Sequence, residues 1–402
     1  MRQLYAIAKN TYLQAVRQPV YGIIVLVTLG GMAMAPFLTG FTLDDDDRML
    51  RDIGLSTLLI QGLFLACFVA TSVLDSEIED KTALSVVAKP VSRIIFILGK
   101  YLGVMGALLT AHYLAGISFF MAMRHGVLQS SAQSSDVTVI LFGPALMLLL
   151  VLAAAIMNYL SEWRFLPTLL ALLVPFMTLA MLILLFINRD FSVNRNETTQ
   201  NIDALLPELV EEGVFKGIIS FRPNEGNARF EGHSGKLVRS NHKGPISDED
   251  RAYLLELSDD IPWKKTVRYL VDSTRKLQGR EILKASCLIF WAVGLLAALA
   301  VAAATRLGLL LTFLINFLAI AVGLVSDQVI RPMAELPGLW GGLWTAAYRV
   351  VPNFQLFWMV DALNEYRLIP LSYVVSTSGY ALAYIAALLL LAMSLFETRE
   401  VG

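Results

Sequence analysis

Long apolar runs separated by polar links are the dominant pattern of this chain. Each run is long enough to cross the hydrocarbon core of a bilayer as a helix, which needs about 20 predominantly apolar residues. The runs are residues 20–39, 55–74, 94–122, 137–160, 165–187, 285–304, 307–325 and 370–393. The pattern therefore predicts an all-α polytopic membrane protein with about eight transmembrane helices.

The links divide the chain into four regions. Residues 1–19 hold apolar positions such as Leu4, Ile7 and Ala8 near one helical face, which predicts an amphipathic entry helix in the cytoplasmic interface. Five spans form a first transmembrane block, residues 20–187, and three spans form a second block, residues 282–402. Residues 188–281 lie between the blocks.

Residues 188–281 are rich in charge and have a pattern of their own. Alternation over residues 214–220 predicts a strand, and residues 236–239 are a candidate partner strand. Residues 248–257 and 263–277 have helical patterns. We expect a small inserted α+β domain with a thin core.

A second unusual segment, residues 326–369, precedes the last span. It is rich in Trp, Gly and Pro, with Trp340, Trp344 and Pro352 among them. Tryptophan favours the membrane–water interface, so the segment is typical of short interfacial or re-entrant helices.

Composition agrees with a membrane location. Hydrophobic residues make up 56% of the chain and charged residues 16%, whereas soluble domains have roughly 45–50% apolar residues. The net charge of -1 and the absence of a basic tract give no indication of nucleic-acid binding. Cys67 and Cys287 both fall inside apolar runs, where we expect each to pack as a small hydrophobe.

Basic residues indicate the orientation. With the N-terminus inside, the short cytoplasmic links carry more Lys and Arg than the outer links, most clearly in the first half. This predicts both termini in the cytoplasm, residues 188–281 outside, and a multi-pass protein of the plasma membrane, which in bacteria is the inner membrane.

The spans lack the groups that self-powered transport needs. No Asp or Glu occurs in any proposed span, and Lys100, near a span end, is expected to reach the headgroups. His112 is expected to bond a hydroxyl or carbonyl rather than to act in chemistry. No phosphate-binding loop of the Gly-x-x-x-x-Gly-Lys-Ser/Thr type is present. We expect no catalytic, cofactor or metal site, so energy for active transport must come from another protein.

The link over residues 75–93 is the most organised of the polar links. Ser76 and Glu79 have the spacing of a capping box, and Pro90 would end a short helix. Leu84 and Val87 give this helix apolar surface. A solvated turn that merely joins two spans is the alternative from the residues alone.

The link also carries a family pattern. Glu77-x-Glu79-x-Lys81-Thr82, then Val87-Ala-Lys-Pro-Val-Ser-Arg93 and Phe96-x-x-Gly99-Lys100, resemble the link between the second and third helices in ABC-2 type transporter permeases. Residues 8–17 and 392–400 resemble the entry helix and closing span of that family. The resemblance covers residues 1–187 and 284–402 and leaves the middle unaccounted for.

The resemblance implies a permease subunit of an ATP-binding cassette transporter, an exporter by analogy, with no ATPase activity of its own. Its partners would be a cytoplasmic ATPase subunit, a second permease copy or paralogue, the lipid bilayer and an extracytoplasmic protein. The implied docking residues are Ser76, Glu77, Glu79, Lys81, Thr82, Leu84, Val87, Lys89, Pro90 and Arg93. The alternative is a membrane-anchored sensor or scaffold whose outer domain binds a ligand or partner. The residues do not identify the cargo.

Overall fold

The computed structural model describes most of the chain. It covers residues 2–39, 46–79, 92–125, 136–187, 191, 218–222, 227–231, 237–239, 261–364 and 369–397. Two compact units result: one comprises Met1–Leu182, Ala285–Val360 and Pro370–Gly402, and the other Ile183–Lys284 and Asp361–Ile369.

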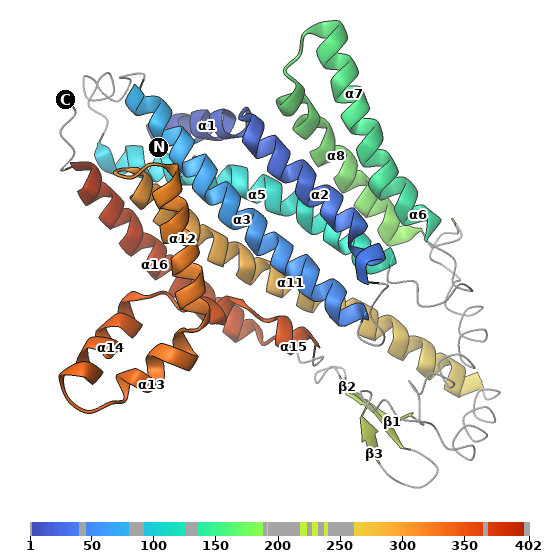
Figure 1. The fold of residues 1–402 in the computed structure, drawn as a ribbon. Coiled ribbons are helices and arrows are strands. Elements are labelled where there is room, and N and C mark those ends of the chain that lie inside the picture. Colours follow the sequence, from blue (N-terminus) through green and yellow to red (C-terminus); the bar gives the residue numbers. More distant parts are fainter. Residues whose placement is uncertain are drawn as a thin grey trace. The chain divides into compact units, whose positions relative to one another are not determined.

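The long helices follow the predicted runs (Figure 1). They are α1 (Arg2–Val16), α2 (Pro19–Thr39), α3 (Asp46–Glu79), α5 (Arg93–His125), α7 (Leu146–Ser161), α8 (Phe165–Phe186), α11 (Ile261–Ala304), α12 (Leu309–Leu324) and α16 (Leu371–Glu397). In the described part, seven segments are long and apolar enough to cross a membrane, and α12 forms an eighth with Ser326–Ala334 after a 58° bend. The prediction of a helical protein with about eight candidate spans is confirmed, and its character is that of a multi-pass membrane protein.

Short helices complete the architecture. The α6 helix (Val137–Ile140) and a π-helix, η1 (Leu141–Ala145), lead into α7. The predicted short helices of residues 326–369 are also present as a π-helix η2 (Ser326–Ile330), α13 (Arg331–Ala334), α14 (Leu339–Val350), a 3₁₀ helix η3 (Phe354–Phe357) and α15 (Val360–Asn364).

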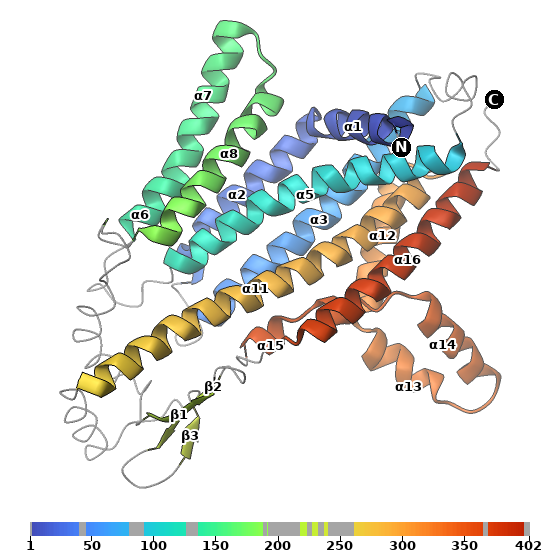
Figure 2. The same ribbon diagram turned by 180° about the vertical axis from the view of Figure 1, so that it is seen from behind.

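The bundle is built around the span of α11. About 72% of its apolar window is buried by other helices, against 22% for α7 and α16. From Ala285 onward its own buried side chains are mostly alanine, valine, leucine and isoleucine, and the small ones permit close packing. Figures 1 and 2 show α2, α3 and α5 running alongside one another and α7 and α8 forming a separate hairpin, and α12 packs against α3.

Two helices continue farther than hydropathy predicts. The α3 helix starts at Asp46 and runs past the apolar run to Glu79. Ser76 therefore lies inside a helix, and the prediction of a capping box that begins a new one is wrong. No Gly or Pro interrupts residues 75–79, so nothing in the backbone chemistry stops α3 there. Likewise α11 begins at Ile261 and contains both the predicted helix 263–277 and the predicted span.

Three short strands are described in the inserted region. They are β1 (Ile218–Arg222), β2 (Asn227–Glu231) and β3 (Leu237–Arg239), in the order β1-β2-β3 with antiparallel pairing. The expected pairing of the first and last strands is wrong, because β2 lies between them. Sequence patterns overlooked β2, which alternates polar and apolar residues over only five positions. The predicted helix 248–257 lies outside the described residues.

Hydrogen bonds tie α5 to its neighbours inside the bundle. Tyr21 on α2 donates to the carbonyl of Ala107 at 2.9 Å, and Tyr101 donates to Gly294 on α11 at 3.2 Å. His112 Nε2 lies 3.0 Å from Ser286 Oγ on α11. The expectation that this histidine bonds a hydroxyl is confirmed, although the hydroxyl belongs to another helix.

The two cysteines differ in their surroundings. Cys67 is buried, as expected, whereas Cys287 is exposed on α11. The apolar run that contains Cys287 has one face turned away from the bundle, and hydropathy alone does not reveal which residues lie on that face.

Candidate functional site

Several helix ends and links meet at one end of the bundle, which we call the link end. It comprises α1, the ends of α3 and α16, the start of α5, and the turn between α11 and α12. Figures 1 and 2 both show α1, the start of α5 and the end of α16 near one another, close to the two labelled termini. The resemblance to permeases concerns these same segments.

The α1 helix packs directly on the backbone of α5. Gly99 and Gly103 are one turn apart on α5 and leave room for it. A Cβ atom at Gly99 would lie 2.7 Å from Ile7 Cγ2, and one at Gly103 would lie 2.6 Å from the carbonyl oxygen of Ala8. The apolar face of α1 is therefore held against a protein helix, because small residues let the two backbones approach closely.

The start of α5 is fastened to the end of α16. Arg93, its first residue, donates to Glu397 Oε1 at 2.8 Å, and the two side chains are 57% and 67% exposed. One turn farther on, the rings of Phe96 and Phe396 stack with centroids 5.4 Å apart. The ion pair is open to solvent and the ring pair is buried on the Phe96 side, so the apolar contact carries more of the binding.

Lys100 is buried in the same region. Its side chain is 1% exposed, and Nζ lies 5.6 Å from the centroid of the Phe96 ring. The prediction that it reaches the headgroups is wrong. The α1 helix, which covers the neighbouring glycines on α5, and the Phe96 ring supply an environment within the protein, and a cation over an aromatic face is favourable there.

A second arginine fastens the same end of α16. Arg306, in the turn between α11 and α12, donates from Nε to the carbonyl of Leu395 at 3.0 Å. The last carbonyls of a helix have no partner within the helix, and a cationic donor satisfies one of them while favouring the negative end of the helix dipole. Thus α5 and the α11–α12 turn both hold the C-terminal turn of α16.

The predicted docking residues divide into three groups. Ser76, Glu77 and Glu79 lie in the last turns of α3, and Arg93 begins α5. Between them, Lys81, Thr82, Leu84, Val87, Lys89 and Pro90 lie outside the described residues. The structure thus brings the two flanks of the link to the same end of the bundle as α1.

Buried polar groups lie where α3 meets α12. The rings of Phe64 and Phe313 are 5.1 Å apart, and the helices run in opposite directions. Gln61 precedes Phe64 by about one turn and Asn316 follows Phe313 by about one turn. Because the helices are antiparallel, the two amide side chains lie at the same level along the bundle. Both are buried, and within the described part of the chain neither amide atom of Gln61 has a hydrogen-bond partner.

The opposite end of the bundle, which we call the far end, contains a chain of hydrogen-bonded polar groups. Asp327 accepts from Tyr348 at 2.6 Å and from Asn353 at 2.8 Å, and the backbone N–H of Asn353 donates to Tyr380 at 2.8 Å. The carboxylate raises the pKa of the Tyr348 hydroxyl, chiefly through their hydrogen bond. Gly323 allows Phe354 and the carbonyl of Pro352 to approach α12.

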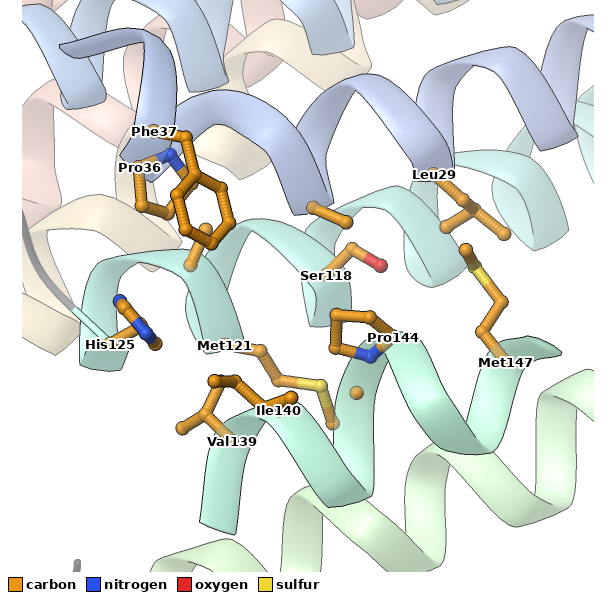
Figure 3. A pocket seen from close by; sticks show the side chains of 13 residues that line it. Leu29, Pro36, Phe37, Ser118, Met121, His125, Val139, Ile140, Pro144 and Met147 are labelled. Carbon is orange, nitrogen blue, oxygen red and sulfur yellow. The ribbon is translucent and has the colours of Figure 1, made fainter. Parts of the chain in front are cut away.

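A small apolar pocket opens between α2, α5 and the segment formed by α6, η1 and the start of α7. Figure 3 shows Phe37 and His125 at one end, Leu29 and Met147 at the other, and Ser118 and Pro144 between them. The lining suits an apolar group and provides no Asp, Glu, Lys or Arg side chain to bind an ion.

Neither metal-binding side chains nor similarity to known proteins points to a further functional site in the described part of the chain. Among the described residues, no group of three or more His, Cys, Asp or Glu side chains could hold a metal ion. No protein-family model matches the chain, and neither the curated proteins nor the solved structures contain a match.

Several residues of the link end were missed by sequence reasoning. Arg306 and Glu397 are charged residues near span ends, and nothing in their neighbourhood predicts which carbonyl or cation they meet. Gly103 had a usable signal, since it follows Gly99 by four residues and this spacing is typical of close helix packing.

Proposed function

We propose that this protein is the membrane-spanning permease subunit of an ABC-2 type transporter, an exporter powered by a separate ATPase subunit. The observation that carries the proposal is the patterned link of residues 75–93, whose flanks lie beside α1 at one end of the bundle. The link would enter a cleft of the ATPase, with Leu84 and Val87 filling it and Glu77 and Glu79 offering charge.

The flanks of the link suit the transmission of movement. Since α3 is one uninterrupted helix from Asp46 to Glu79, a rotation imposed at its end reaches the middle of the bundle. There α3 meets α12 through Phe64 and Phe313, beside the buried amides of Gln61 and Asn316. Closure of the ATPase subunits would shift this interface and alternate the access of the pathway.

The contacts at the C-terminal end of α16 support the same proposal. Arg93 and Arg306 join α16 to the start of α5 and to the α11–α12 turn. A force on the link would therefore act on α3, α5 and α16 together. Two permease copies or paralogues and two ATPase subunits would form the complete transporter, with both termini in the cytoplasm and an α+β domain of residues 188–281 outside.

Affinity purification from the native membrane tests the docking assignment. The wild-type chain is expected to bring down a soluble ATPase with a phosphate-binding loop, and the ATPase activity of the complex should be measurable. Leu84→Asp should abolish both recovery and activity, because a carboxylate in an apolar cleft is desolvated without a partner. The control, Leu84→Met, keeps the apolar volume and should retain both.

A sensor or scaffold is the second candidate, and one observation favours it. The 44-residue helix α11 runs without interruption from the inserted region into the bundle, which is suited to carrying a signal from an outer ligand. Recovery of the wild-type chain with outer-face proteins and without an ATPase would support this candidate and reject the permease.

A further inference from the structure

Glu281 and Lys284 both bind the backbone of one residue, Ile369. They lie one turn apart on α11, and their side chains pair at 2.6 Å between Lys284 Nζ and Glu281 Oε1. Glu281 Oε2 also accepts from the backbone N–H of Ile369 at 2.7 Å. Lys284 Nζ donates to the carbonyl of the same residue at 2.8 Å. The four groups close a ring.

The surroundings make this ring strong. Glu281 and Ile369 are both buried, so the carboxylate and the peptide N–H have little water to replace their bonds. Hydrogen bonds to charged groups are about twice as strong as neutral ones. Removing one member leaves a buried charge or a buried peptide group unsatisfied, which costs more than the bond contributed.

Pro370 restricts the backbone conformation of Ile369. A residue before proline is restricted to extended conformations, which expose its N–H and C=O to a neighbouring element. Pro370 then starts α16, since its carbonyl accepts from Tyr373 and Val374. Only Pro370 therefore separates Ile369, whose N–H and C=O are both bound, from the first residue of α16.

We propose that Glu281 and Lys284 form a latch that makes the inserted-region end of α11 and the start of α16 move as one body. The α11 helix extends 20 residues on the N-terminal side of Glu281, from Ile261, and so carries movement of the inserted region to the latch. Through α16 the movement reaches Glu397 and its partner Arg93 at the link end. The latch does not depend on the identity of the protein bound at the link.

Amide hydrogen exchange, read by mass spectrometry on the full chain in nanodiscs, measures the latch directly. Pro370 has no amide, and no hydrogen bond within α16 holds the first N–H groups after it. The first two residues of a peptide lose their label before detection, so a peptide spanning residues 367–372 retains label only from Ile369 onward. Its slow amide is therefore that of Ile369. Glu281→Gln and Lys284→Met should each speed its exchange at least about tenfold. Arg280→Gln removes an exposed neighbouring charge and should leave the exchange unchanged.

A distance measurement tests the common movement. Spin labels at Leu283 and Leu371, both exposed, would be placed in a Cys67→Ser, Cys287→Ser background and measured by pulsed electron resonance. The distance distribution should be narrow with the latch intact and at least about twofold wider with Lys284→Met. Unchanged exchange in both variants would overturn the latch. Faster exchange with an unchanged distance distribution would overturn the coupling of α11 to α16.

Discussion

The two ends of the bundle are fastened in different ways. At the far end, both carboxylate oxygens of Asp327 accept hydrogen bonds, one from Tyr348 and one from Asn353. At the link end, the ion pair of Arg93 with Glu397 is more than half exposed, and a backbone carbonyl holds Arg306. The other contacts described there are mainly apolar, through Phe96 and the α1–α5 packing, with one long hydrogen bond between Tyr12 and Thr110.

The difference indicates which end can move. A carboxylate held by two short hydrogen bonds has one favourable geometry, whereas apolar surfaces can slide and exposed ion pairs can exchange with water at little cost. The far end therefore suits a fixed frame and the link end a movable one. A link that receives force from an ATPase would need the movable kind.

The largest effect is expected where α1 meets α5. Gly103→Leu places a side chain against the Ala8 carbonyl, so α1 must leave its position, and the free energy of unfolding should fall by about 3 kcal/mol. The apparent melting temperature in detergent and the hydrogen exchange of α1 measure this. Gly116→Leu is the matched control on the same helix, since no atom lies within 4 Å of its Cβ position. Equal effects from both variants would show that α1 is not seated on Gly103.

A somewhat smaller effect is expected at the far end. Asn353→Ala removes the bond to Asp327 and the one that Oδ1 accepts from the backbone N–H of Gln355, which caps η3. Because Asn353 is only 8% exposed, the free energy of unfolding should fall by about 2 kcal/mol. Thermal unfolding of this variant is compared with that of Gln328→Ala, an exposed neighbour. A loss no greater than that of the control would mean that the network does not fix this end.

The smallest effect is expected for the exposed ion pair. A double-mutant cycle with Arg93→Gln and Glu397→Gln should give a coupling of about 0.5 kcal/mol, because both side chains are solvated. The coupling should vanish in 1 M salt, where the Debye length is about 3 Å. A coupling as large as the cost of Asn353→Ala would remove the distinction between the two ends.

Hydropathy was sufficient for the spans but not for their ends. Each apolar run became a helix because twenty apolar residues have one good solution in a bilayer. The polar residues 75–79 also continue a helix, and the capping-box spacing of Ser76 and Glu79 could not reveal this, since the same residues occur at helix ends and within them. The break after residue 325 was predicted from the change to a segment rich in Trp, Gly and Pro, whereas the 58° angle between α12 and Ser326–Ala334 was not.

Contacts between helices were the least predictable feature. The burial of Lys100 depends on which helices surround it. The residues next to Lys100 in sequence do not indicate that α1 packs beside it. The family pattern Phe96-x-x-Gly99-Lys100 now has a packing explanation: the phenylalanine stacks on Phe396, the glycine admits α1, and the lysine lies over the ring. A residue pattern can thus match a family for structural reasons, independently of docking.

The central claim is that an ATPase docks on the link, and site-specific photo-cross-linking in the native membrane tests it most directly. A photoreactive amino acid would replace Leu84 in one variant and Trp340, an exposed residue of α14, in the other. The account predicts an adduct between position 84 and a soluble ATPase with a phosphate-binding loop, and no such adduct from position 340. Absence of an ATPase adduct at position 84, in chains that insert normally, would contradict the account.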